Sequence, residues 1–197
     1  MRHYYDDNSD LKSEQQSFVF EYRNNHITFT SDNGVFSKTM IDYGSRVLLD
    51  NINIDQQKTM LDVGCGYGTF GLSLKKCYPQ LQIDMVDVND RAIDLTKINA
   101  NNNHLQVNVF KSYIYEKITK CYDLIVTNPP IRAGKEVVHE ILEKAFVHLN
   151  DNGQLWVVIQ KKQGAPSAKA LMEKVFGNCK VVKKDKGYYI LVSIKAS

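Results

Sequence analysis

Residues 61–71 read LDVGCGYGTFG and place three glycines between an apolar segment and the start of a helical pattern. Gly64, Gly66 and Gly68 let the chain turn sharply and let a ligand lie against backbone N–H groups at the N-terminus of the next helix. The dinucleotide fingerprint is G-x-G-x-x-G, whereas this loop reads G-x-G-x-G. The stretch therefore predicts a strand, a turn and a helix that bind a different adenosine-containing ligand.

Strand-like and helical segments alternate on both sides of this loop. Runs typical of strands lie at 59–63, 82–88, 106–110, 122–127 and 154–160, and helical patterns lie at 69–77, 90–102, 136–149 and 168–176. Such alternation predicts right-handed crossovers and an α/β fold with a parallel sheet covered on both faces. The final runs, 180–184 and 188–194, are separated only by Asp185, Lys186 and Gly187, so the last strand is predicted to be antiparallel.

A small hairpin is expected before the main domain. Residues 18–23 and 26–30 are rich in aromatic and β-branched residues and flank Asn24-Asn25, a pair that tolerates a tight turn. A helical pattern then runs from about 41 to 51. We expect a mobile arm over 1–17, the hairpin and helix over 18–56, and the main domain over 57–197.

The composition sets broad limits. The chain has 197 residues, 43% of them hydrophobic, and a net charge of +3, which is typical of a globular protein and only permits an RNA partner. Its apolar runs are too short to span a membrane, and its polar start lacks the pattern of a secretory signal, so we expect a cytoplasmic protein. The four cysteines form no C-x-x-C pair and the five histidines show no metal spacing, so we expect reduced thiols and no metal site.

Two carboxylates accompany the glycine loop. Asp87 ends the second core strand about 20 residues after the loop, where a carboxylate can accept hydrogen bonds from ribose hydroxyls. Asp62 precedes the loop and is predicted to face either the edge of the core or an ammonium group of the ligand. The structural alternative is a glycine turn needed only for packing, with Asp87 capping a strand, but strand, glycines, helix and acid in this order favour ligand binding.

The fourth core strand ends in Asn128-Pro129-Pro130-Ile131. Ligands of open parallel sheets gather at the carboxyl ends of the strands, so this turn is expected beside the glycine loop. Two prolines remove backbone donors and stiffen the turn, which leaves the Asn128 side-chain oxygen and a backbone carbonyl as fixed acceptors that suit an NH₂ group. An isolated N-P-P is more often a plain turn, but the preceding glycine loop and acid favour the functional interpretation.

These motifs together resemble those of a known family. LDVGCGYGTFG, VDVNDRAI with Asp87, DLIVTNPPI and the antiparallel last strand resemble the class I S-adenosylmethionine-dependent methyltransferases with an NPP motif. Residues 32–49, DNGVFSKTMIDYGSRVLL, and 127–135, TNPPIRAGK, are similar to the RsmC-type family, the small-subunit ribosomal RNA guanine-N2 methyltransferases and their shorter relatives. The resemblance implies a Rossmann-like, doubly wound sheet with S-adenosylmethionine across the glycine loop.

The resemblance also implies roles for single residues. The three glycines would approach the amino-acid part of the donor, Asp87 its ribose and Val88 its adenine. Where an acidic residue often meets the adenine amine, this chain has Lys111, Ser112 and Tyr113, and Ser112 is the candidate for that contact. The expected donor-binding residues are therefore Asp62, Gly64, Cys65, Gly66, Gly68, Asp87, Val88, Ser112 and Asn128.

On the substrate side, the hypothesis is that an exocyclic amine attacks the methyl group in line while Asn128 and the Pro129 carbonyl accept its hydrogens. Ile131 replaces the aromatic residue that often follows the two prolines, so the base is expected either to pack against this apolar side chain or to stack on a residue from elsewhere, such as Phe36 or Tyr43. The remaining expected substrate contacts are Pro130, Ile131, Arg132 and Lys135, with a possible basic extension at Lys161, Lys162, Lys183, Lys184 and Lys186.

The leading prediction is an N-methyltransferase that acts on guanine N2 of an unpaired or flipped base in ribosomal RNA. One alternative is a methyltransferase for a glutamine side-chain amide of a protein, because an NPP turn can hold that amide as well. Another is a donor-binding or RNA-binding module without catalysis, and a nicotinamide enzyme ranks last because of the glycine spacing and the antiparallel last strand. We expect an RNA partner and no membrane partner.

Overall fold

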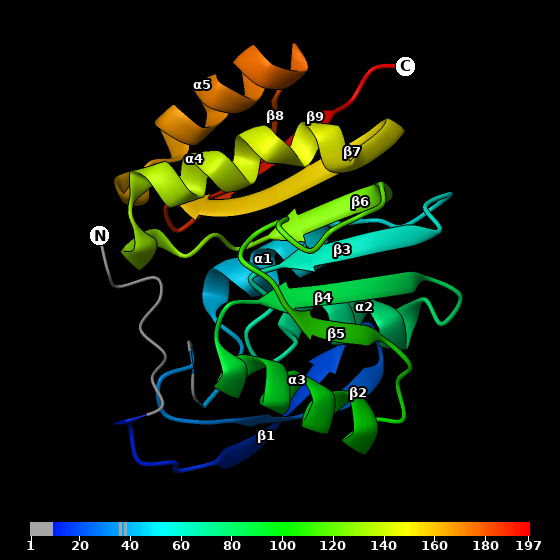
Figure 1. The fold of residues 1–197 in the computed structure, drawn as a ribbon, viewed down its shortest axis with the longest axis vertical. Helices are drawn as coiled ribbons and strands as arrows, with labels where there is room; N and C mark the ends of the chain where they lie inside the picture. Colours follow the sequence, from blue (N-terminus) through cyan, green and yellow to red (C-terminus); the bar gives the residue numbers. More distant parts are fainter. Residues whose placement is uncertain (1–9, 36, 38) are drawn as a thin grey trace.

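A seven-stranded sheet forms the centre of the computed structural model, which describes residues 10–35, 37 and 39–197 (Figure 1). Its strands are β3 (Thr59–Val63), β4 (Gln82–Asp87), β5 (Asn108–Lys111), β6 (Tyr122–Thr127), β7 (Leu149–Gln160), β8 (Lys180–Asp185) and β9 (Tyr188–Ile194), in the order β5-β4-β3-β6-β7-β9-β8. β3 to β7 pair in parallel, whereas β9 is antiparallel to β7 and β8. The predicted Rossmann-like, mostly parallel sheet with an antiparallel last strand is confirmed.

Helices cover both faces of the sheet. The helices are α1 (Tyr43–Asn51), α2 (Thr69–Cys77), α3 (Asp90–Asn102), α4 (Lys135–Lys144) and α5 (Ala165–Phe176), with short 3₁₀ turns at η2 (Ile131–Ala133), η3 (Ala145–His148) and η4 (Lys161–Gln163). Apolar side chains of α1, α2 and α3 pack in one core cluster, and those of α4 and α5 pack in another on the opposite face. Figure 1 shows α4 and α5 side by side over the β7 half of the sheet.

The parallel register brings three loops to one edge of the sheet. Val63 at the end of β3 pairs with Val86 of β4 and with Thr127 of β6. The next residues along the three strands are Gly64, Asp87 and Asn128, so these lie at the same level at the carboxyl end of the sheet. The sheet therefore assembles the glycine loop, the acid and the NPP turn as the sequence predicts.

Three predicted boundaries shift in the second half of the sheet. The helix expected over 136–149 ends at Lys144 and continues as the 3₁₀ turn η3, and strand β7 already begins at Leu149 rather than at 154. Leu149 is buried and pairs with Tyr122 of β6, so sheet pairing takes this residue out of the helix. Helix α5 begins at Ala165, three residues earlier than expected, and has a proline in its first turn.

The N-terminal hairpin consists of β1 (Gln16–Tyr22) and β2 (Asn25–Ser31). Tyr22 pairs with Asn25, so the two-residue turn is Arg23-Asn24 and lies one residue before the expected Asn24-Asn25. Both turn residues have positive φ, +48° and +62°, as a tight hairpin turn requires. The Arg23 guanidinium contacts the carbonyl oxygen of Leu49 at 3.3 Å, which fixes this side chain against the end of α1 and explains the shift.

The hairpin shares its core with the main sheet. Phe29 is fully buried in the same cluster as the apolar side chains of α1, α2 and α3. The outer edge of β2 pairs with the side chains of Asn99 in α3 and of Asn103, the residue that follows this helix. Asn99 accepts from Thr30 N at 2.7 Å and donates to Thr30 O at 2.9 Å, and Asn103 bonds both backbone groups of Thr28 in the same way. The proposed boundary at residues 56/57 thus crosses a continuous core.

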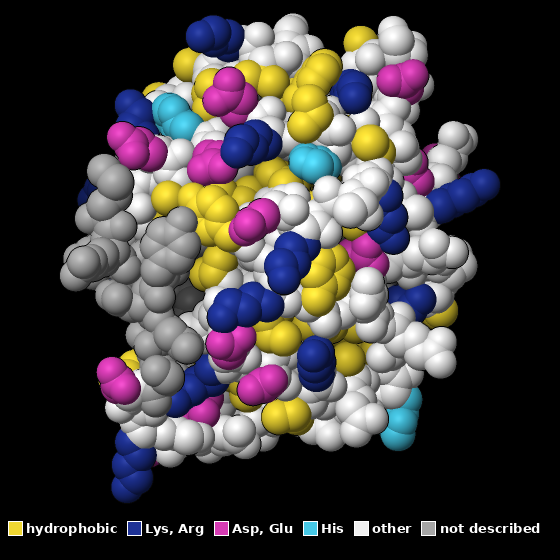
Figure 2. Space-filling model, viewed as in Figure 1, with side chains coloured by type: hydrophobic (Ala, Val, Ile, Leu, Met, Phe, Trp, Pro, Cys, Tyr) yellow, Lys and Arg dark blue, Asp and Glu magenta, His cyan; other side chains and the backbone are white. Residues whose placement is uncertain are grey.

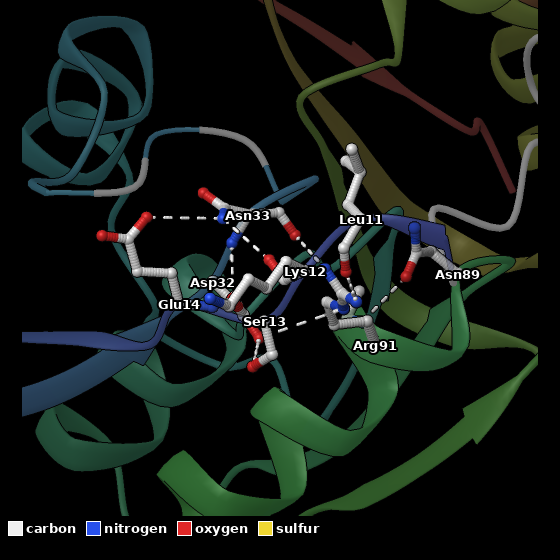
Figure 3. Close-up of polar contacts among 9 residues, drawn as sticks. Leu11, Lys12, Ser13, Glu14, Asp32, Asn33, Asn89 and Arg91 are labelled. Carbon is white, nitrogen blue, oxygen red and sulfur yellow. Dashed lines mark hydrogen bonds and ion pairs between the residues drawn. The ribbon is translucent and has the colours of Figure 1, made fainter.

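The segment before the hairpin is held in place (Figure 3). The buried carboxylate of Asp32 accepts hydrogen bonds from Ser13 Oγ and Glu14 N, both at 2.6 Å, and Arg91 of α3 donates to Leu11 O at 2.6 Å. Within the range 1–17, for which we expect a mobile arm, β1 begins at Gln16 and residues 11–14 are hydrogen-bonded to the rest of the protein. Residues 1–9 lie outside the described part of the chain.

Candidate active site

The three glycines of the loop have different local surroundings. All have positive φ, +73° at Gly64, +57° at Gly66 and +108° at Gly68. A methyl group added at Gly64 or Gly66 would meet no heavy atom within 4 Å, whereas one at Gly68 would lie 2.6 Å from a methyl carbon of Leu72. Gly64 and Gly66 therefore border open space that a ligand can enter, and Gly68 is needed for packing against α2.

Backbone N–H groups of the loop bond to the protein itself. Gly64 N and Cys65 N both donate to Val86 O at 2.9 Å, and Gly66 N donates to Asp87 Oδ2 at 2.9 Å. The N–H groups expected to face a ligand are therefore those at the N-terminus of α2, whereas these three are committed within the protein. Their contribution is a rigid loop that leaves space beside it.

Two polar side chains of α3 fix the carbonyl groups of this loop. Thr96 Oγ1 donates to Gly66 O at 2.7 Å, and Asn99 Nδ2 donates to Tyr67 O at 2.8 Å. Both side chains are fully buried, and the sequence analysis missed them. Thr96 and Asn99 share the face of α3 that carries Ala92 and Ala100, so helical periodicity can mark them as buried but cannot identify their partners in the loop.

Asp87 lies where the sequence predicts, half-buried at the end of β4. Its carboxylate oxygens accept one hydrogen bond each from Gly66 N and Asn89 N, at 2.9 and 3.0 Å. Burial raises the pKa of Asp87, although these N–H donors oppose that shift. Each oxygen keeps a lone pair for a further donor, as a pair of ribose hydroxyls requires. Val88 follows it, also half-buried.

Asp62 lies beneath the loop and is 1% exposed. Its Oδ2 accepts from Gly71 N of α2 at 3.0 Å, and its Oδ1 has no hydrogen-bond partner within the described ranges. Burial raises the pKa of this carboxyl to about 7, with a smaller contribution from the charge of Asp87. The side chain thus faces the core through one oxygen and leaves the other available.

Two expected donor contacts have side chains that the protein itself uses. Cys65 is 5% exposed and contacts Thr96 Oγ1 at 3.7 Å, and burial raises the pKa of its thiol well above the ordinary value. The Ser112 hydroxyl donates to Ile114 O at 3.0 Å and accepts from Lys117 N at 3.2 Å. Ser112 is 2% exposed, so its hydroxyl is committed to the turn after β5 and is a poor candidate for an adenine contact.

Asn128 is half-buried directly after β6, at the level of Gly64. Its amide nitrogen Nδ2 lies 3.4 Å from Asp42 Oδ1 and 3.2 Å from Ser45 Oγ, two residues at the start of α1. Asp42 is the N-cap of that helix and accepts from Ser45 N at 3.2 Å. Burial raises the pKa of Asp42, opposed by its hydrogen bonds with Ser45 and Gly44.

The two prolines of the NPP turn lie in different local surroundings. Pro130 O accepts from Ala133 N at 3.0 Å within the 3₁₀ turn η2, and Pro129 is buried at the end of β6. Ile131 packs against the core of α4 and α5 and lines a cavity of about 210 Å³ with Lys135 and Val138. Ile131 therefore belongs to the α4 side of the turn.

Of the two aromatic candidates for base stacking, the structure describes Tyr43, the first residue of α1. Phe36 falls outside the described residues. Tyr43 is 36% exposed, with its ring centroid 5.9 Å from that of Tyr188 and Lys186 Nζ 4.7 Å from its own centroid. Tyr67 of the glycine loop donates to Ser37 O at 3.1 Å, so the segment between the hairpin and α1 is tied to the loop.

Basic side chains gather near the same edge of the sheet. Arg132 and Lys135 follow the NPP turn, and Lys161 N donates to Gly187 O at 2.8 Å, which brings η4 beside the β8–β9 turn and Lys186. Lys161, Lys162, Lys183, Lys184 and Lys186 are all exposed. On the face drawn in Figure 2, by contrast, basic and acidic side chains are interspersed.

The part of the chain that the structure describes contains neither a candidate metal site nor a candidate membrane-spanning helix. It contains no group of three or more His, Cys, Asp or Glu side chains that could hold a metal ion. Of the helices in that part, none has the length and apolar character needed to cross a membrane.

Two relatives of known sequence are similar to most of this chain. The uncharacterized protein YbxB of Bacillus subtilis (strain 168) is 47% identical over 98% of this chain and 98% of its own length. Ribosomal RNA small subunit methyltransferase C of Aliivibrio fischeri (strain ATCC 700601 / ES114) is 34% identical over 89% of the chain and 52% of its own length. The chain thus spans about half the length of the methyltransferase C relatives it matches.

A solved structure shares the fold. The T. thermophilus 16S rRNA N2 methyltransferase RsmC, in complex with AdoMet and guanosine, superposes with a TM-score of 0.84 at 24% identity, over 94% of this chain and 52% of that one. A family model described as methyltransferase small domain matches residues 26–192, which include all but the first residue of the hairpin strand β2, the glycine loop and the NPP turn. The chain belongs to the methyltransferase small domain family.

Proposed function

We propose that this chain is an S-adenosylmethionine-dependent N-methyltransferase that modifies guanine N2 in ribosomal RNA. The observation that supports the proposal is the pairing of Val63 with Thr127, because it brings Asn128 level with Gly64, a glycine that borders open space. A group that accepts amine hydrogens thus adjoins a space suited to an adenosine-containing donor. The names of the methyltransferase C relatives support ribosomal RNA as the substrate class.

The residues of the site fit the proposed donor. Gly64 and Gly66 leave space beside the loop, Asp87 keeps lone pairs for two ribose hydroxyls, and the unpartnered Oδ1 of Asp62 is a buried acceptor for an ammonium group. When bound, S-adenosylmethionine supplies an electrophilic methyl group on a sulfonium. The protein then has to place an amine within about 3 to 3.5 Å of that group and needs no strong base.

Asn128 and Pro129 would hold the amine. Asn128 Oδ1 and the Pro129 carbonyl each accept one N–H of the exocyclic NH₂, which turns the nitrogen lone pair toward the methyl group. The two prolines stiffen the turn, so both acceptors keep their direction without a cost in backbone entropy at the moment of reaction.

Arg132, Lys135, Lys161 and Lys162 would contact phosphates around the target base, because they are exposed at the edge of the sheet that carries Asn128. Such contacts position a nucleic acid without reading its sequence. The target guanine has to be unpaired or flipped, since its amine is engaged inside a helix.

A labelling assay tests the proposal. Purified protein is incubated with tritiated methyl donor and with ribosomal RNA or small ribosomal subunits from cells that lack the gene, and the RNA is then digested to nucleosides. Label in N2-methylguanosine is the expected result. Label in a protein glutamine, or no transfer despite donor binding by calorimetry, would refute the RNA assignment.

Variants of the site separate its two halves. Asn128→Ala is expected to lower transfer by more than a hundredfold while the donor Kd changes little, because Asn128 acts on the amine. Asp87→Ala is expected to weaken donor binding at least tenfold, because two hydroxyl contacts to a charged group are lost. Equal losses of donor affinity in both variants would contradict this division of roles.

A further inference from the structure

The motif Asp42-Tyr43-Gly44-Ser45 lies at the start of α1, and the proposed reaction assigns it no role. Two of its side chains contact the catalytic amide: Asn128 Nδ2 lies 3.4 Å from Asp42 Oδ1 and 3.2 Å from Ser45 Oγ. Ser45 is 4% exposed and Asn128 is half-buried, so these contacts are largely shielded from water.

The start of α1 is seated closely on the sheet. A methyl group on Gly44 would lie 2.5 Å from two ring carbons of Tyr188 and 3.1 Å from Val158 Cγ2. Only glycine allows this approach of the helix to β7 and β9. The same approach fixes Asp42 and Ser45 on either side of Gly44, so their oxygens face Asn128 in one position.

The chemistry of the acceptors decides which way the Asn128 amide points. An ionised carboxylate can only accept hydrogen bonds, so the group of Asn128 that faces Asp42 has to be the NH₂. The Ser45 hydroxyl also hydrogen-bonds to Asp42 and therefore donates its proton there, which leaves its oxygen to accept from Asn128. Among the described residues, Asn128 Oδ1 has no partner, so the carbonyl end of the amide remains for the substrate.

We infer that Asp42 and Ser45 are positioning residues that hold the Asn128 amide with its oxygen toward the substrate amine. Without them the amide can rotate by 180° and present NH₂ to the NH₂ of the substrate, which gives no hydrogen bond and a repulsive contact. The inference rests on the proposed function of Asn128, and it adds the origin of that residue's orientation.

The main test variant is Asp42→Ser/Ser45→Ala. Serine keeps the N-cap of α1 but is too short to reach Asn128, and alanine is well tolerated inside a helix. Asp42→Asn is the conservative variant, because its amide oxygen can cap the helix and still accept from Asn128. Asn51→Ala is the control: it removes the bond from Asn51 Nδ2 to Val47 O, 2.7 Å, at the far end of the same helix.

The double variant is expected to lose about 10²-fold in kcat with less than a threefold change in donor Kd, because only the orientation of a catalytic acceptor changes. Asp42→Asn should keep at least a third of the wild-type kcat, and Asn51→Ala should match the wild type. A wild-type kcat in the double variant, or an equal loss of kcat and donor affinity, would overturn the inference.

A second readout does not depend on turnover. The side-chain amide ¹H–¹⁵N signals of Asn128, assigned by their absence in Asn128→Ala, should move in the double variant and stay in place in Asn51→Ala. Unmoved signals in the double variant would overturn the positioning role. If the wild type transfers no methyl group to RNA while the signals move as expected, the proposed substrate fails and the positioning role stands.

Discussion

Replacing Asp62 by asparagine is expected to make the fold less sensitive to rising pH. The carboxyl group is 1% exposed, and burial raises its pKa in the folded protein from the ordinary 3.8 to about 7. Because its pKa is raised in the folded protein, the folded state binds this proton more tightly than the unfolded chain does. The unfolding free energy therefore falls once the pH is high enough for the unfolded chain to release the proton. This loss begins to grow above pH 4 and levels off above pH 7.

The size of the effect follows from the shift. About three pKa units at 1.36 kcal/mol each give an upper bound of about 4 kcal/mol. Between pH 5 and pH 8 the wild type should lose roughly 2 to 3 kcal/mol of unfolding free energy through this group alone. Asparagine cannot ionise and can still accept from Gly71 N, so the variant lacks this loss.

Urea unfolding of both proteins at several pH values measures the difference directly. The contribution of Asp42, whose pKa is also raised, is common to both proteins and cancels, whereas Asp87 is coupled to Asp62 by charge, so its smaller contribution is part of the measured difference. The gap in unfolding free energy should widen from pH 5 to pH 8 in favour of Asp62→Asn. Parallel pH profiles would refute the argument, because they would mean that Asp62 is already ionised in the folded protein at low pH.

Three further predictions concern the glycine loop and its support. Gly66→Ala is expected to weaken donor binding at least tenfold by calorimetry, because the new methyl group enters the open space beside the loop. Its positive φ of +57° should also lower the unfolding free energy by about 1 to 2 kcal/mol. The control Gly177→Ala, with φ +77° and equally open surroundings at the end of α5, should lower the unfolding free energy by a similar amount and leave the donor affinity unchanged. Asn99→Ala leaves Thr30 N, Thr30 O and Tyr67 O without partners and should lower the unfolding free energy by about 3 kcal/mol in urea titrations; a loss below 1 kcal/mol would contradict this role. A thiol reagent should label exposed Cys121 of the native protein first and Cys65 only on unfolding, as mass spectrometry can show, because Cys65 is buried with a raised pKa; early labelling of Cys65 would show that the loop opens.

The sheet could be predicted because its signals are local. Each strand is a short apolar run, each crossover carries a helical pattern, and a three-residue link after Lys184 leaves only an antiparallel return. The positions of Gly64, Asp87 and Asn128 then follow from one rule, that parallel strands end at the same edge. No side-chain contact had to be known to bring these residues together.

The supports of the site could not be predicted in this way. Thr96 and Asn99 read as ordinary polar residues of a helix, and their partners Gly66 O and Tyr67 O lie about 30 positions earlier in the chain. Asp42 is the N-cap of α1, and its contact with Asn128 spans 86 positions. Which of these residues meet depends on how distant segments pack against one another, and the local sequence pattern does not indicate that packing. The predicted adenine contact of Ser112 meets a related difficulty, because hydrogen bonds within the local turn occupy its hydroxyl.

The hairpin belongs to the scaffold of the candidate site. Asn99 bonds Thr30 of β2 on one side and Tyr67 of the glycine loop on the other, and the Tyr67 ring packs edge-on against Phe29 at 5.6 Å. A displacement of β2 would therefore be passed to the loop through one buried side chain and one ring contact. The Tyr67 hydroxyl in turn holds Ser37 O, in the segment that leads to Asp42. Hairpin, glycine loop and the helix that orients Asn128 are thus coupled through Tyr67, and we expect their local stabilities to change together.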